Sequence, residues 1–147
     1  MSADLIFSIC NLAILPGWAL LIAFPRWKWT LGLIASGIIP FVLGLVYVGL
    51  IFSQAGDSVD GGGFGSLEAL YLLFSNPYGL TAAWVHYLAF DLFVGAWEVH
   101  DSQQKSISHW LVLPCLPLTL MLGPTGLVLY LVIRTIKTRE VRIYSTT

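Results

Sequence analysis

His86 and Asp91, whose side chains can bind or release a proton, lie in the middle of one apolar segment. This segment runs from about Pro77 to Val99. Measured from a helix start at Asn76, at about 1.5 Å per residue, His86 lies about 15 Å and Asp91 about 22 Å along a helix of roughly 36 Å. If the segment crosses a membrane, a carboxylate at this depth is costly. Asp91 is therefore expected to face the interior of the protein with a partner, or to be protonated. Proton transfer in a dry site is the chemistry that such groups support.

The side chains of this segment fall on two stripes when they are placed at about 100° per residue. One stripe holds His86, Phe93, Trp97 and His100, and the other holds Trp84, Asp91 and Glu98. Asp91 and His86 point about 140° apart, so they are not a base and its orienting partner, although they are placed to flank one elongated ligand. We expect His86 to face a cavity on the same side as Trp97. Glu98 either reaches the membrane interface or belongs to the site.

Metal and haem sites are not indicated by the histidines. His86 lies about 20 Å from the end of its segment where His100 and His109 lie, so no two histidines on different segments share a level in the membrane. The spacing of His100, Asp101 and His109 matches no strong metal motif. We therefore expect no metal and no cofactor.

The composition places the chain in lipid. Of 147 residues, 57% are apolar and 10% charged, and the mean hydropathy is +0.82, whereas a soluble domain carries about a quarter charged residues. A formal net charge of -1 without a basic face excludes nucleic-acid binding as a main role. Cys10 and Cys115 each lie alone in an apolar segment and are expected to be buried free thiols.

Four apolar segments are long enough to cross about 30 Å of hydrocarbon. They cover about residues 5–24, 30–52, 77–99 and 108–133, and a basic tail covers 134–147. The short connections predict one all-α domain, with four transmembrane helices in a compact bundle. A short apolar run before the third segment predicts a half-helix at the interface. We expect the first segment to be retained, because it has neither a basic start nor a small-residue cleavage site.

Prolines and charges add detail to this arrangement. Pro114, Pro117 and Pro124 predict a kinked fourth helix with unpaired carbonyls. The glycine-rich loop that holds Asp57 and Asp60 lacks a phosphate-binding motif and is expected to be a flexible loop. Cations occur in the first loop, in the third loop and in the tail. With four spans, the first loop and the tail lie on opposite sides, so the positive-inside rule gives no single orientation.

The run from Asn76 to Glu98 resembles a known family: the abscisic-acid-deficient family of small four-helix membrane proteins, whose plant members are required for neoxanthin synthesis. The likeness extends through His109-Trp110-Leu111 and Leu122-Gly123-Pro124-Thr125-Gly126. The resemblance implies a carotenoid pathway and the conversion of an epoxy-carotenoid, violaxanthin, to an allenic one. It also implies a membrane location, which is the plasma or thylakoid membrane in bacteria, or a plastid membrane if the chain is organellar.

For the chemistry that the resemblance implies, Asp91 would be the base, and His86 or Tyr87 would supply or relay a proton. Further residues would line a slot for the polyene or bind it; these are Trp84, Phe90, Phe93, Trp97 and Glu98. The slot is expected along the third segment and against the bent fourth, with Gly95 at its border.

Three classes of function stay open: a carotenoid isomerase, a non-catalytic carotenoid or pigment binder, and a structural or assembly subunit of a larger membrane complex. The partners expected are a carotenoid or another long apolar ligand and the lipid bilayer, without nucleic acid. Whether the chain forms a homo-oligomer or joins a larger complex also stays open.

Overall fold

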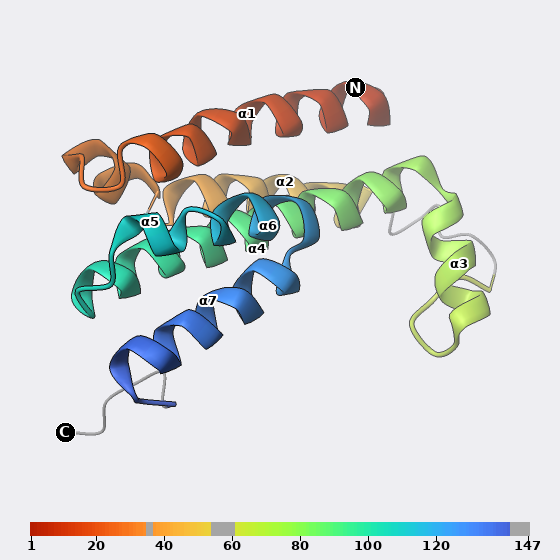
Figure 1. Ribbon diagram of the computed structural model, residues 1–147. Helices are drawn as coiled ribbons and strands as arrows, with labels where there is room; N and C mark the ends of the chain where they lie inside the picture. The colour runs from red at the N-terminus through yellow and green to blue at the C-terminus, as the bar shows by residue number, and fades with distance from the viewer. Residues whose placement is uncertain (35–36, 54–60, 142–147) are drawn as a thin grey trace.

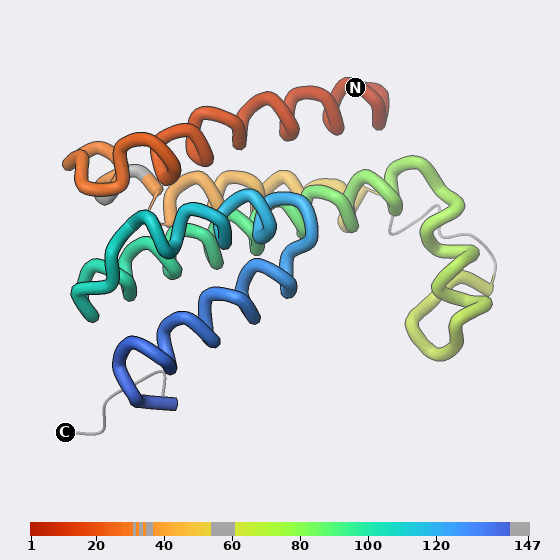
Figure 2. The backbone as a smooth tube through the Cα atoms, viewed as in Figure 1, coloured from red at the N-terminus to blue at the C-terminus, as the bar shows by residue number. Residues whose placement is uncertain are grey.

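The computed structural model describes residues 1–34, 37–53 and 61–141. The bounds of the elements are Ala3–Ala23 for α1, Thr30–Ile34 for the π-helical turn η1, Ile38–Ser53 for α2, Leu67–Ser75 for α3, Pro77–Gln104 for α4, His109–Val112 for α5, Cys115–Leu122 for α6 and Pro124–Thr138 for α7. Within these ranges no residue lies in a β-strand. The all-α fold class that the sequence predicts is therefore confirmed for this part of the chain (Figures 1 and 2).

The central element is α4, against which α1, α2, α3, α5, α6 and α7 all pack. The side chain of Asn76 caps its start by accepting a hydrogen bond from the N–H of Tyr78 at 2.8 Å. Pro77 occupies the first turn, where its missing N–H costs nothing, as the Asn-Pro pair predicts. The helix continues to Gln104, beyond the predicted end at residue 99, because Asp101 is buried against another helix instead of lying in a loop.

The second predicted segment, residues 30–52, is not one continuous helix. The turn η1 covers its first residues, and α2 begins only at Ile38. Between the two, Gly37 has a φ of +78°, a conformation that residues with a side chain rarely adopt. The hydroxyl of Thr30 donates a hydrogen bond to the carbonyl of Phe24 at 2.7 Å and ties η1 to the end of α1.

A short helix, α3, lies where the sequence predicts a half-helix before the third segment. The side chain of Ser66 caps α3 by accepting a hydrogen bond from the N–H of Ala69 at 3.1 Å. Asn76 is extended, with φ −75° and ψ 126°, so α3 does not continue into α4. Figure 1 shows α3 projecting from one end of the bundle. Asp57 and Asp60 lie outside the described residues.

The fourth predicted segment, residues 108–133, is three helices and not a single kinked one. At Gly123, φ is 41° and ψ is −97°, so the helix cannot continue. The chain reverses there, and α7 runs back along α6 (Figure 1). The two helices cross closely at Gly126, where a Cβ atom would overlap Thr119. The prolines predict the breaks at residues 113–114 and 123–124, but the single kinked helix is wrong, because the dihedral angles of Gly123 reverse the chain.

Two helices, α1 and α4, are long and apolar enough to cross a membrane by length and composition. The helix α2 and the α5–α6 pair are apolar but shorter. The outward surfaces of α1 and α2 carry large apolar side chains, among them Leu12, which is 69% exposed, and Phe41, which is 67% exposed. Others on these two helices are Leu5, Ile9, Leu15, Val42, Leu45 and Val48. Extended apolar surfaces of this kind mark contact with lipid or with another protein.

Candidate functional site

Acidic side chains line the face of α4 that packs against α6 and α7. Asp91 and Glu98 are separated by two helical turns, and Asp101 follows one turn later, so the three lie near one face. Their exposed fractions are 9%, 0% and 6%. Asp91 thus faces the interior, as the sequence predicts. We call these three residues the acidic row.

Asp91 lies halfway along α4, against the turn between α6 and α7. A Cβ atom on Gly123 would be 2.9 Å from Oδ1 of Asp91, so the glycine leaves the room that the carboxyl group needs. Oδ2 of Asp91 is buried without a hydrogen-bond partner among the described residues. Because α7 begins at Pro124, the positive end of its dipole lies close to this carboxyl group. A buried acidic oxygen left free is available to a proton or a ligand.

Tyr87 lies one turn before Asp91 and is half-buried. Its hydroxyl donates a hydrogen bond to the carbonyl of Leu120 at 3.3 Å. That carbonyl belongs to the last turn of α6, where the helix itself supplies no N–H. The Asp91 carboxyl group lies one helical turn farther along the same side of α4. Helical spacing therefore makes a proton donor and a proton acceptor neighbours on α4, and the break in the fourth segment adds the Leu120 carbonyl beside them.

Glu98 belongs to the same buried face and does not reach the interface. Its Oε1 accepts a hydrogen bond from the hydroxyl of Thr119 in α6 at 3.0 Å. Its Oε2, like Oδ2 of Asp91, is buried without a partner in the part of the chain that the structure describes. The side chain is 0% exposed, which excludes the interfacial position that the sequence left open.

An ion pair closes the far end of the acidic row. Oδ2 of Asp101 accepts hydrogen bonds from Nε of Arg134 at 2.8 Å and from the hydroxyl of Tyr130 at 2.6 Å. Arg134 is only 1% exposed. The sequence pattern assigns Arg134 to a basic tail and does not indicate Tyr130 as its neighbour. The one available signal was their spacing of four residues, which puts both on one face of a helix.

His86 lies on a different side of α4 from the acidic row. Its ring is exposed and stacks on Phe90, with the ring centroids 4.5 Å apart, and lies 5.5 Å from the ring of Tyr47 in α2. It lines a cavity of about 240 Å³ beside α2 and α3. Trp97 instead packs edge-on against Tyr130 of α7, at 5.5 Å. The expectation that His86 and Trp97 share a cavity is wrong, because different helices cover their two sides.

The predicted aromatic residues do not form a single slot. Trp84 stacks on Tyr87 at a centroid distance of 5.1 Å and lies 5.7 Å from Phe7 of α1. Phe90 and Phe93 are 58% and 55% exposed. Of the predicted aromatic residues, Trp84 is therefore the one that lies next to the Tyr87–Asp91 pair.

The groove expected beside Gly95 is filled by Trp18 of α1. A Cβ atom on Gly95 would lie 2.7 Å from Cη2 and 2.8 Å from Cζ3 of the indole. Trp18 is itself only 2% exposed. Gly95 is thus a packing position between α1 and α4 and does not border an open groove.

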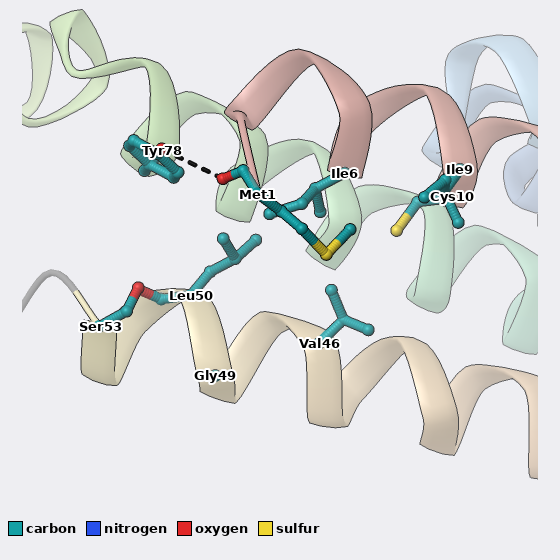
Figure 3. A pocket seen from close by; sticks show the side chains of 9 residues that line it. All are labelled: Met1, Ile6, Ile9, Cys10, Val46, Gly49, Leu50, Ser53 and Tyr78. Carbon is teal, nitrogen blue, oxygen red and sulfur yellow. Dashed lines mark hydrogen bonds between the residues drawn. The ribbon is translucent and has the colours of Figure 1, made fainter.

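A larger apolar cavity, of about 660 Å³, lies between α1 and α2 near the start of α4 (Figure 3). Its lining consists of Met1, Ile6, Ile9, Cys10, Val46, Gly49, Leu50, Ser53 and Tyr78. The hydroxyl of Tyr78 donates a hydrogen bond to the carbonyl of Met1 at 3.2 Å (Figure 3). The cavity has the size of a small-molecule site, but no acid or histidine lines it. It is suited to holding an apolar molecule, and the polar side chains on its lining are Cys10, Ser53 and Tyr78.

His100 and His109, near the third loop, contact different residues. His100 contacts the amide of Gln104 at 2.9 Å, and His109 contacts the carbonyl of Ile22 at 2.9 Å. Over residues 1–34, 37–53 and 61–141, no three His, Cys, Asp or Glu side chains gather where they could hold a metal ion.

Comparison with known proteins gives one family. Residues 5–130 match the sequence profile of the ABA DEFICIENT 4-like family. The chain is also 26% identical, over 140 residues, to the protein ABA DEFICIENT 4, chloroplastic, of Arabidopsis thaliana. That alignment covers 91% of this chain and 62% of the relative, so the chain spans less than two thirds of the relative's length. No solved structure matches.

Proposed function

Since this chain belongs to the ABA DEFICIENT 4-like family, we propose that it is an integral membrane protein of carotenoid metabolism that isomerises violaxanthin to neoxanthin. The observation that carries the proposal is the buried Asp91 carboxyl group, which keeps one oxygen free among the described residues and lies one helical turn from Tyr87, halfway along α4. A buried carboxyl group and a phenol are a base and an acid for such an isomerisation.

Membrane embedding is the first part of the proposal. Its support is the length and apolar composition of α1 and α4, together with the exposed apolar surfaces of α1 and α2. Four segments of the chain enter the bilayer: α1, α2, α4 and the segment that holds α5, α6 and α7. Asp91 then lies near the middle of the bilayer, where a carboxyl group is energetically costly and usually has a function.

The second part is the assignment of roles. Asp91 removes a proton from a carbon of the polyene, a C–O bond of the epoxide breaks, and the electron pair left behind forms the allene. Tyr87 delivers a proton to the epoxide oxygen, which becomes a hydroxyl group. One proton leaves and one arrives, so substrate and product are isomers and no oxidant is needed. Tyr87 fits the role of donor better than His86, which lies on the other side of α4.

The third part is the path of the ligand. The turn at Gly123 lies beside Asp91, so α6 and α7 leave the first half of this α4 face uncovered. Leu80 and Trp84 on that half are 56% and 37% exposed. A long apolar ligand lying along this uncovered half would place one end ring at Asp91. Glu98 lies two helical turns beyond Asp91, under α6 and 0% exposed, so it lies past the end of this path and is not assigned a contact with the ligand.

The test is conversion of violaxanthin by the purified protein reconstituted in lipid vesicles. Product is measured by chromatography and by the absorption spectrum of neoxanthin. The proposal expects neoxanthin to form in proportion to the amount of protein, and protein-free vesicles to form none. Vesicles that hold the folded protein and violaxanthin but form no neoxanthin would contradict it.

The alternative of a non-catalytic carotenoid binder is favoured by the apolar cavity between α1 and α2, whose lining holds neither a carboxyl group nor an imidazole. The same experiment separates the two functions. The alternative expects violaxanthin to co-purify with the protein and to remain unchanged.

A further inference from the structure

Hydrogen bonds tie the first loop, the third loop and the C-terminal segment to one end of the bundle. The amide of Gln103, in the last turn of α4, donates a hydrogen bond to the carbonyl of Pro25, which follows α1, at 2.8 Å. Nζ of Lys105 lies 3.0 Å from Oε2 of Glu140, which follows α7. Figure 1 shows the ends of α1, α4 and α7 at the same end of the molecule. We call this the cationic end.

Every Lys and Arg among the described residues lies at this end. They are Arg26, Lys28, Lys105, Arg134, Lys137 and Arg139. Arg134 and Lys105 are paired with acids, whereas Arg26 and Lys28 lie on the exposed surface with Lys137 and Arg139. Arg142 lies outside the described residues. The opposite end, where α1 and α3 begin, carries the acidic Asp4 and Glu68.

Tryptophans surround the exposed cations. Trp27, Trp29 and Trp110 are 49%, 51% and 80% exposed, and Nζ of Lys28 lies 5.7 Å from the centre of the Trp29 ring. Tryptophan beside lysine and arginine is the composition of a membrane–water interface, where the rings lie at headgroup depth and the cations meet anionic lipids.

The reversal at Gly123 is what gathers the cations. If residues 108–133 crossed the membrane completely, the tail would emerge on the side of the N-terminus, away from Arg26 and Lys28. Instead the turn lies beside Asp91, halfway along α4, and α7 returns to the cationic end, where Arg134 pairs with Asp101. All described cations then lie on one side of the membrane, so the positive-inside rule gives a single orientation, which it does not give for four complete spans.

Given the membrane embedding on which the proposed function also rests, we propose that α5, α6 and α7 form a re-entrant hairpin that enters and leaves the bilayer at one face, and that this face docks on the anionic headgroups of the cytoplasmic leaflet. At the break, Gly123 is buried against Asp91 and the Tyr87 hydroxyl donates a hydrogen bond to the carbonyl of Leu120, so backbone at this depth is covered or paired within the protein. The N-terminus and α3 lie on the opposite side of the membrane.

Three single cysteines test the hairpin in a bacterial inner membrane. Gly65→Cys reports the α3 end, Ser108→Cys the third loop, and Val141→Cys the residues after α7; all three positions are exposed. Cys10 and Cys115 are buried, so the parent chain gives the background. With a membrane-impermeant maleimide, Gly65→Cys should be labelled in intact spheroplasts. Ser108→Cys and Val141→Cys should be labelled only after permeabilisation.

Each other labelling pattern would refute a specific part of the proposed topology. Labelling of Val141→Cys together with Gly65→Cys in intact spheroplasts would show a complete fourth crossing and refute the hairpin. Exclusive labelling of Ser108→Cys and Val141→Cys in intact spheroplasts would refute the cytoplasmic orientation. Release of the protein by alkaline carbonate would refute membrane embedding itself, whereas failure to convert violaxanthin leaves the topology result standing.

Neutralising the exposed cations tests the headgroup contact. In a chain with Arg26, Lys28, Lys137 and Arg139 all changed to glutamine, the fraction of Val141→Cys labelled in intact spheroplasts should rise several-fold. An unchanged fraction would refute docking through these charges.

Discussion

Replacing Gly95 by alanine tests the contact between α1 and α4 that supports the candidate site. The added Cβ would lie 2.7 Å from Cη2 of Trp18, well inside van der Waals contact, and the indole is only 2% exposed and has little room to move. Overpacking of this kind costs about 1–3 kcal/mol. Alanine in place of glycine within a helix gains roughly 0.5–1 kcal/mol. We therefore expect the Gly95→Ala protein to lose about 1 kcal/mol of unfolding free energy.

The matched control is Gly44→Ala in α2, where a Cβ atom would meet nothing within 4 Å. This variant should gain roughly 0.5–1 kcal/mol from helix propensity alone. The two variants should then differ by about 2 kcal/mol, which isolates the packing term at Trp18. The assay is reversible unfolding in mixed micelles with increasing sodium dodecyl sulfate. Equal stability of the Gly95→Ala and Gly44→Ala proteins would refute the packing described for α1 and α4.

Two further substitutions examine the ion pair and the apolar cavity. Arg134→Gln leaves Asp101 buried without its cation and should cost about 3–5 kcal/mol of unfolding free energy in the same assay. The control Lys137→Gln, on the surface, should be within about 0.5 kcal/mol of the parent. Similar stabilities of the two variants would refute the buried ion pair between Arg134 and Asp101. Gly49→Leu adds a side chain to the cavity between α1 and α2 and should lower the amount of violaxanthin that co-purifies if the ligand is held there. Unchanged pigment in the folded Gly49→Leu protein would exclude this cavity as the binding site.

The start of α4 could be predicted from the sequence because it depends on neighbouring residues. Asn76 and Pro77 set a cap and a first turn, and both act over a few residues of chain. The inward position of Asp91 follows as well, because a carboxyl group in an apolar segment avoids lipid. Both features are confirmed, and neither requires knowledge of which helices are neighbours.

The reversal after α6 could not be predicted in the same way. Proline marks a break in a helix but does not say in which direction the chain continues. That direction depends on the dihedral angles of Gly123 and on the docking of Arg134 against Asp101, which lie 33 residues apart in the chain.

The aromatic slot was mispredicted for a related reason. Helical periodicity gives the angular position of a side chain, but it does not identify the helix that covers that position. Trp97 is covered by α7, His86 lies beside α2, and Gly95 is filled by Trp18 of α1. Asp91, Tyr87 and Trp84 are therefore the predicted site residues that lie together in the structure, whereas Asp101 was not among the predicted site residues.

The central claim is that Asp91 acts as the base, and the rate of violaxanthin conversion by the Asp91→Asn protein tests it most directly. The amide is nearly the same size as the carboxyl group, so the variant should fold like the parent but cannot accept the proton. The control is Glu68→Gln, which removes an exposed carboxylate from α3. We expect full conversion by the parent and by Glu68→Gln, and a loss of at least about a hundredfold by Asp91→Asn. Conversion by the folded Asp91→Asn protein at the parent rate would contradict the claim.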